Sequence, residues 1–273
     1  MNFQLLDTLR QIKPVVLNIS NFVTVQDVAN GLSALGASPI MSEESAETED
    51  IVQISQAIQL NFGAFTTEQV AHIKKTGQLG NQYQLPVVVD PVAVSSINYR
   101  HQIIPQLLQE FHADIIRGNT SEIATLGGFS WQAKGIDSAD GKGDRRFIAM
   151  QTAQKYHCII IMSGATDIIT NGTAVTQITN GTPLLQVHVG SGDMLSSISA
   201  AFAAVSPHNL YQAAQMAALV VAVSGELAAQ QQSTLGPGTF TAALLDELAN
   251  INIQDLQQTA HYQTQEENNA ATN

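Results

Sequence analysis

A glycine-rich turn carries the residues best suited to chemistry: Gly190, Ser191, Gly192 and Asp193, directly before an apolar, alanine-rich segment. Glycine permits unusual backbone angles and a close approach of a ligand. The first amides of the helix that follows lack intrahelical partners and lie at the positive end of its dipole, so they favour a phosphate. Asp193 adds a carboxylate that can accept a proton from a hydroxyl. The pattern predicts phosphoryl transfer to an alcohol, although an aspartate in a first helical turn also occurs as a simple cap.

A second carboxylate ends a short apolar run. Asp90 follows Val87–Val89, and Pro91 ends the strand because proline cannot continue the hydrogen-bond ladder. A carboxylate at this position can orient a hydrated magnesium ion, which prefers a few carboxylates and keeps several waters. The alternative is an aspartate that only forms a turn.

Arg117, Asn119 and Glu122 form a third group, after the next predicted strand. Asn119 and Glu122 have the spacing of a capping box, which needs no ligand. In the functional interpretation Glu122 lies near the water shell of magnesium, and Arg117 donates to nucleotide phosphates as a fork. Because Asp90, Asp193 and this group are all expected at strand ends, we favour the functional interpretation.

The order of apolar and helical segments predicts the elements that position these residues. Five short apolar runs predict strands: 15–19, 57–61, 87–89, 115–116 and 159–162. Helical patterns separate them: 25–35, 67–82, 99–110, 121–126 and 145–157. This alternation indicates a mainly parallel sheet with helices on both sides, that is, a three-layer α/β/α fold. Ligands of such sheets bind beyond the carboxyl ends of the strands, where the polar residues above are expected.

The remaining segments complete the prediction. Two Asn-Gly pairs flank Thr173–Thr179 and predict a β-hairpin that interrupts the alternation. The last third is mostly helical, with helices expected over 194–205, 210–232 and 239–248. We expect a single domain over residues 1–257 and a disordered tail over 258–273, because the end is polar and rich in Gln, Asn and Glu.

Composition limits the class of protein. The chain has 273 residues, 44% hydrophobic and 12% charged, with a formal net charge of −12. This balance fits a compact globular protein and argues against a nucleic-acid surface or an anionic membrane surface as a partner. The single cysteine, Cys158, lies in an apolar run and is expected to be a buried strand thiol. We also expect no signal peptide and no membrane span, and therefore the cytoplasm.

Seven segments in order along residues 14–248 carry a family resemblance: 36–41, 88–92, 116–122, 163–167, 190–193, 225–229 and 236–240. Together they resemble hydroxyethylthiazole kinase, the thiamine-salvage branch of the ribokinase-like superfamily. The resemblance implies a ribokinase-like fold and magnesium-dependent transfer of the ATP γ-phosphate to the primary alcohol of 4-methyl-5-(2-hydroxyethyl)thiazole. It also implies a homotrimer with active sites between subunits.

The same resemblance implies roles for individual residues. Arg117 and Ser163 match positions that contact ATP, and Asn119 is assigned to the cofactor with them. Met41 and Gly190 match positions that contact the thiazole, and Asn21 is assigned to the same substrate. Asp193, expected from its own chemistry to be the general base, lies within the catalytic turn of residues 190–193. Asp90 and Glu122 are associated with magnesium.

One residue departs from the family pattern. Many thiazole kinases have cysteine where this chain has Asp193, so the turn is closer to that of sugar and pyrimidine kinases. An aspartate is ionised near neutral pH, whereas an unperturbed thiol is mostly protonated, so the change favours catalysis. The acceptor therefore remains open between the thiazole alcohol and a hydroxymethylpyrimidine or sugar. A non-catalytic nucleotide-binding protein or a nucleotide-dependent dehydratase on the same fold is the alternative from another class.

Overall fold

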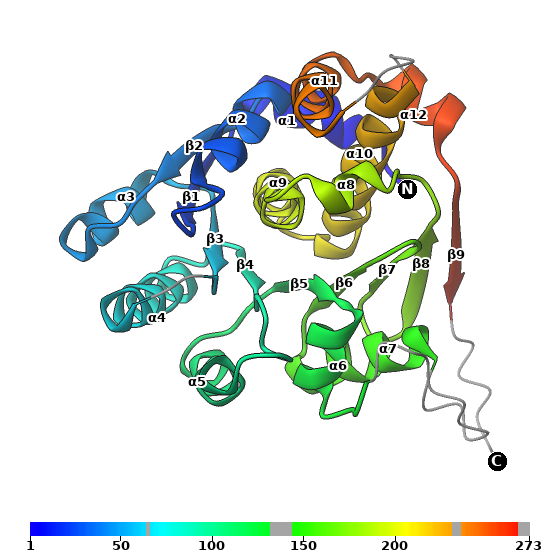
Figure 1. The fold of residues 1–273 in the computed structure, drawn as a ribbon. Coiled ribbons are helices and arrows are strands. Elements are labelled where there is room, and N and C mark those ends of the chain that lie inside the picture. The colour runs from blue at the N-terminus through cyan, green and yellow to red at the C-terminus, as the bar shows by residue number, and fades with distance from the viewer. Residues whose placement is uncertain (64–65, 132–143, 231–235, 267–273) are drawn as a thin grey trace.

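The predicted apolar runs form the centre of a nine-stranded sheet in the computed structural model, which describes residues 1–63, 66–131, 144–230 and 236–266. The strand order is β2-β1-β3-β4-β5-β6-β7-β8-β9 (Figure 1). Strands β2 to β6 in this order are parallel, and β7, β8 and β9 continue the sheet in antiparallel pairing. Their bounds are β1 Val15–Ile19, β2 Ser38–Met41, β3 Ala57–Asn61, β4 Val87–Asp90, β5 Ile115–Asn119, β6 Ile159–Ser163, β7 Asp167–Thr170, β8 Ala174–Ile178 and β9 Tyr262–Glu266.

Helices cover both faces of the sheet, as the sequence predicts (Figure 1). One face packs against α1 Gln4–Ile12, α2 Val25–Leu35, α9 Ser191–Val205, α10 Leu210–Gln230, α11 Pro237–Asn250 and α12 Ile253–Thr259. The other packs against α3 Thr48–Ile54, α4 Thr67–Gln82, α5 Asn98–Glu110, α6 Thr120–Gly127 and α7 Arg145–Tyr156. Two short elements, η1 Ser45–Glu47 and α8 Leu184–Val187, lie in connections. A buried apolar cluster fills each interface, and burial of these clusters holds the three layers together.

The predicted strands are present, and three of them are longer than predicted. The bounds of β1, β3, α2 and α4 agree with the sequence patterns, while β4, β5 and β6 extend to Asp90, Asn119 and Ser163. The last residues of these strands are polar. The apolar run in the sequence therefore ends before the hydrogen-bond ladder of the strand does. Three of the predicted site residues, Asp90, Asn119 and Ser163, are thus the last residues of their strands.

Helix α10 is the longest helix among the described residues and is apolar enough to cross a membrane by length and composition. The sequence predicts no membrane span. In the structure, 78% of its most apolar stretch is buried inside the protein, where it packs on α9 and on the sheet. It is therefore the central helix of a core.

The predicted disordered tail is wrong for residues 258–266. The boundary at 257 falls inside α12, and β9 pairs with β8 from Tyr262 opposite Ile178 to Glu266 opposite Ala174. All five residues of β9 are exposed, because an edge strand is held mainly by backbone hydrogen bonds and needs no apolar side chains. Its polar composition therefore resembles that of a disordered segment. Residues 267–273 lie outside the described part of the chain.

A core substitution in α9 tests whether packing against the sheet supports the helix that carries Asp193. Phe202 is completely buried in the apolar cluster, so Phe202→Ala leaves a cavity and should lower the free energy of unfolding by about 3–5 kcal/mol. Urea denaturation measures the change. The control is Phe147→Ala, since Phe147 is 41% exposed and should cost much less. Equal losses in the two variants would contradict this packing.

Candidate active site

The glycine-rich turn leads into α9, as predicted. Gly190 has φ 102° and forms the N-cap, a conformation that favours glycine, and an added Cβ there would meet the Thr24 side chain at 2.9 Å. Ser191 is tied to the preceding segment: its hydroxyl donates to the Leu185 carbonyl at 2.6 Å and its amide to the His188 carbonyl at 3.2 Å. The helix's own hydrogen bonds begin with the amide of Met194. The amides of Gly192 and Asp193 therefore precede that ladder, whereas the Ser191 amide, predicted to stabilise a phosphoryl group, already has a partner.

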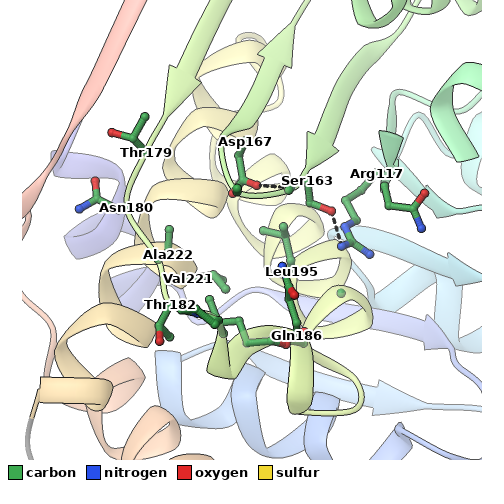
Figure 2. A pocket seen from close by; sticks show the side chains of 18 residues that line it. Arg117, Ser163, Asp167, Thr179, Asn180, Thr182, Gln186, Leu195, Val221 and Ala222 are labelled. Atoms are coloured by element: carbon green, nitrogen blue, oxygen red, sulfur yellow. Dashed lines mark hydrogen bonds between the residues drawn. The ribbon is translucent and has the colours of Figure 1, made fainter. Parts of the chain in front are cut away.

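Two cavities meet at this turn, beyond the carboxyl ends of the strands. The larger, about 610 Å³, is lined by residues of β5, β6, the 179–186 segment, α9 and α10 (Figure 2). The smaller, about 400 Å³, is lined by residues that include Asn21, Thr24, Asp90, Glu122 and Asp193. Arg117, Asn119 and Gly192 line both cavities. The structure therefore joins a larger and a smaller chamber through a shared wall.

Arg117 is the centre of this shared wall. Its Nη2 donates to the Ser163 hydroxyl at 2.6 Å and its Nη1 to Asp90 Oδ2 at 3.3 Å. A Cβ added to Gly192 would collide with the guanidinium, so glycine lets α9 pass Arg117 without displacing its side chain. The buried Nε of Arg117 has no hydrogen-bond partner among the described residues. A buried donor without a partner is costly and indicates an acceptor on a ligand.

Asp90 is buried, with 2% of its surface exposed. Its Oδ2 also accepts from the Ser196 hydroxyl at 3.0 Å, which links β4 to α9. Burial raises the pKa of Asp90 to about 7, opposed by Arg117 and reinforced by the negative charges of Glu122 and Asp193. Three carboxylates thus share one region with two guanidinium groups, since Arg100 also lines the smaller cavity and its charge interacts with that of Glu122. The net negative charge that remains favours an additional cation.

Asn119 and Glu122 form the predicted capping box at the start of α6. The Glu122 amide donates to Asn119 Oδ1 at 3.0 Å, and Glu122 Oε2 accepts from the Asn119 amide at 2.8 Å. The other carboxylate oxygen, Oε1, accepts from the Ala93 amide at 2.8 Å. Glu122 is nonetheless at the wall of the smaller cavity. Its structural role does not exclude a role in binding, because the same carboxylate also contributes charge there.

The Asp193 carboxylate lies inside the wall of the smaller cavity and is held by four side-chain donors. Thr24 and Ser20 donate their hydroxyls to Oδ2 at 2.6 and 2.8 Å, and Gln59 donates to Oδ1 at 2.9 Å. Asn21 contributes a longer contact to Oδ2 at 3.4 Å. Burial raises the pKa of Asp193, and the hydrogen bonds from Thr24 and Ser20 and the charge of Arg117 act in the opposite direction.

The contacts of Asp193 with Thr24 and Gln59 were not predicted from the sequence, and Ser20 had no role assigned to it. Ser20 lies within the polar stretch that follows β1, which marks a strand end, and Thr24 follows it as the N-cap residue of α2. Gln59 is the clearer missed signal: it is a completely buried polar residue in the middle of an otherwise mostly apolar strand. A buried amide at such a position needs a partner, and Asp193 supplies it.

The three residues expected at the acceptor differ in position, and Gly190 lines the smaller cavity. Asn21 lines the smaller cavity, and its Oδ1 accepts from the Val23 and Thr24 amides, which fixes the turn before α2. Met41 ends β2 beside Asn18 of β1 and is partly buried against the apolar cluster of α2 and α9. It is not among the residues that line either cavity.

Asp167 borders the larger cavity beside Ser163. Its Oδ1 accepts from the Gly164 amide at 2.9 Å and so holds the turn between β6 and β7 (Figure 2). Burial raises the pKa of Asp167 to about 6, although that hydrogen bond and the charges of Arg117 and Arg145 oppose the shift. Of the residues expected to contact ATP, Arg117, Ser163 and Asn119 all line this cavity.

The donor set fits magnesium held mainly through water and phosphate. Among the described residues there is no group of three or more His, Cys, Asp or Glu side chains arranged around a metal position. Magnesium in nucleotide sites is commonly bound by one or two carboxylates together with substrate phosphates. Asp90 and Glu122 at the wall of the smaller cavity match that pattern.

Comparison with known proteins agrees with this geometry. The sequence profile of the hydroxyethylthiazole kinase family matches residues 6–254. A hydroxyethylthiazole kinase from Lactiplantibacillus plantarum is 54% identical over 257 residues, which are 94% of this chain and 98% of the relative. The chain belongs to this family.

Solved structures extend the comparison to the fold. The hydroxyethylthiazole kinase of Pyrococcus horikoshii is similar with a TM-score of 0.88 at 27% identity, covering 97% of this chain and 98% of the other. A ribokinase-like superfamily protein from Enterococcus faecalis has a TM-score of 0.61 at 15% identity, covering 91% and 97%. The latter shows the fold alone. The predicted ribokinase-like α/β/α architecture is confirmed.

The environment of Asp167 predicts a pH-dependent contribution to stability. The pKa of Asp167 is about 6 in the folded protein against a reference of 3.8, so between these pH values the folded chain binds more protons than the unfolded chain. The contribution of this group to the free energy of unfolding therefore falls as the pH rises through that window. Asp167→Asn removes the titration. We expect the stability of this variant relative to the parent to increase from pH 4 to pH 7, measured by urea denaturation. The exposed Ser96→Ala serves as control and should show a constant difference; a constant difference for Asp167→Asn would contradict the prediction.

Proposed function

We propose that this protein transfers the γ-phosphate of ATP to the primary alcohol of 4-methyl-5-(2-hydroxyethyl)thiazole, as in thiamine salvage. The observation that carries the proposal is the junction of the two cavities. Asp193 lies at the wall of the smaller one, and Arg117 and Gly192 line both. An alcohol in the smaller cavity and a phosphate in the larger can therefore meet beside one carboxylate and one guanidinium. Membership of the hydroxyethylthiazole kinase family supports this acceptor.

ATP is assigned to the larger cavity with its phosphates toward the junction. Arg117 and Ser163 already share a hydrogen bond there, and the buried Nε of Arg117 lacks a partner, so a phosphate oxygen that displaces the guanidinium slightly would satisfy it. The amide of Gly192 lies at the positive end of the α9 dipole. These groups stabilise the negative charge of the moving phosphoryl group.

Asp193 is assigned as the general base. Its Oδ2 points toward Thr24 and Asn21, which line the smaller cavity with it. An acceptor hydroxyl that approaches from this side gives its proton to the carboxylate as its oxygen bonds to the γ-phosphorus. The bond between that phosphorus and the bridging oxygen breaks, and ADP leaves with the electron pair. The donors behind the carboxylate keep it oriented while the proton moves.

Magnesium is assigned to Asp90 and Glu122, and when bound it neutralises charge on the phosphate oxygens. The raised pKa of Asp90, which its carboxylate neighbours Glu122 and Asp193 reinforce, is the observation in favour, since a cation would favour its ionised form. Ser196 and Arg117 orient the Asp90 side chain toward the shared wall.

A homotrimer with sites between subunits is the proposed assembly, and the cytoplasm the proposed location. Apolar side chains lie exposed around the smaller cavity: Val23 is 58% exposed, Val189 66% and Phe22 70%. Val23 and Val189 belong to its lining. Exposed apolar residues at the mouth of a site fit a surface that another subunit covers. Met41 is kept as a proposed acceptor contact in that assembly.

A panel of acceptors tests the function. With purified protein, ATP and magnesium, we expect the hydroxyethylthiazole alcohol to give a higher kcat/KM than hydroxymethylpyrimidine or a hexose, measured by release of ADP and by phosphate incorporation. A higher kcat/KM for the pyrimidine or for a sugar would contradict the thiazole assignment and identify a different acceptor for the same catalytic residues. Binding of ATP without transfer to any alcohol would contradict a kinase.

Asp193→Asn tests the base. The amide keeps the size of the side chain but cannot accept the proton, so we expect kcat to fall at least about 100-fold while ATP binding is retained. Steady-state kinetics measure the first effect and calorimetric titration the second. Asp50→Asn, an exposed aspartate of α3, is the matched control and should leave both unchanged. Near-normal turnover of Asp193→Asn would refute the assigned role.

A further inference from the structure

The two ends of the larger cavity differ in character. The end at Arg117, Asn119 and Gly192 adjoins the smaller cavity, so the phosphate to be transferred has to lie there. The opposite end is formed by the 179–183 segment, with Val221 and Ala222 of α10 nearby (Figure 2). By elimination, the base and ribose of the nucleotide lie at this second end, if ATP binds as proposed above.

The 179–183 segment forms the wall of the larger cavity at this second end, and Asn180 anchors that wall. It is 7% exposed, and its side chain makes its hydrogen bonds away from α9. Its Nδ2 donates to Glu226 Oε2 and to the Thr259 carbonyl, both at 2.8 Å, and its Oδ1 accepts from the His261 amide at 2.6 Å. Glu226 Oε2 also accepts from the Gly181 amide at 3.3 Å. The wall is therefore fixed from behind by α10 and by the chain that follows α12.

That following chain, residues 260–266, is here named the C-terminal segment. Besides its contact with Asn180, its His261 carbonyl accepts from the Thr179 amide at 3.0 Å, and β9 then pairs along the whole of β8. The Thr264 and Thr176 hydroxyls lie 2.8 Å apart in the middle of this pair. The segment lies beyond residue 254, where the match to the family profile ends.

We propose that the C-terminal segment is a positioning element for the nucleotide: by holding Thr179 and Asn180, it sets the wall against which the base and ribose of ATP bind. The segment does not itself line the cavity. Its effect passes through the two residues that do. Loss of the segment removes the acceptor of the Thr179 amide and the donor to Asn180 Oδ1, so only Glu226 and the Thr259 carbonyl still hold the wall. The wall is then less firmly fixed, while the phosphate end keeps its contacts.

Two truncated proteins test this inference. One ends after Thr259 and lacks the C-terminal segment; the control ends after Glu266 and retains β9. We expect the first to bind magnesium-ATP about 5- to 30-fold more weakly than the control, the fold-change that corresponds to the loss of one or two ordinary hydrogen bonds. Inhibition by inorganic tripolyphosphate, which has no base, should be the same in both. The KM for the alcohol should change less than twofold.

A full-length variant covers the case in which truncation impairs folding. Asn180→Ala removes the contact with the His261 amide, and also those with Glu226 and the Thr259 carbonyl, but leaves β9 and the contact between the Thr179 amide and the His261 carbonyl in place. We expect the same selective loss of ATP affinity. Asn171→Ala, an exposed asparagine in the turn between β7 and β8, is the matched control. Equal ATP affinity in both pairs, or a parallel loss of tripolyphosphate inhibition, would overturn the inference. Nucleotide binding is measured without acceptor, so failure of the thiazole assignment would be seen separately.

Discussion

The buried guanidinium of Arg117 is the interaction on which the site depends. A chain with a net charge of −12 binds a polyanion only where local positive groups outweigh its own field. Arg117 lies between Asp90, Ser163 and Gly192, so it connects β4, β5, β6 and α9 at one point. Its contact with Asp90 offsets part of the cost of burying that carboxylate, and its Nε remains for a ligand.

Two buried aspartates near Arg117 differ in their surroundings. Asp90 accepts from Ser196 and Arg117, and its pKa stays near 7 because burial and its carboxylate neighbours outweigh these contacts. Asp193 receives three short hydrogen bonds from Ser20, Thr24 and Gln59. Such a set of donors suits a carboxylate, which has acceptor sites on two oxygens, whereas a thiol sulfur accepts only weakly. The aspartate that departs from the family's usual cysteine is therefore matched by its immediate environment.

Local patterns were sufficient for five of the six parallel strands, and they missed β2 at the edge of the sheet. Apolar runs with polar ends gave β1, β3 and the helices between strands, and the spacing of Asn119 and Glu122 gave the capping box. Contacts between distant segments were not accessible in this way. Gln59 donates to a residue 134 positions away, and no local pattern encodes that partner. For the same reason β9 was not predicted: its polar sequence forms a strand only because its backbone pairs with that of β8.

The position of α9 explains how residues late in the chain lie beside residues from strands that come early in it. This helix packs on β1, β3, β4 and β5 through its apolar residues, so its axis crosses the middle of the sheet. Its N-terminus is consequently delivered to the carboxyl edge, between the strand ends that carry Asn21 and Arg117. Small residues make this approach possible: Gly192 lies against Arg117, and Gly31 of α2 lies against Met194. A larger side chain at either position would displace the Arg117 guanidinium or the Met194 side chain. Close packing of the core therefore sets the distance between the proposed base and the phosphate-binding groups.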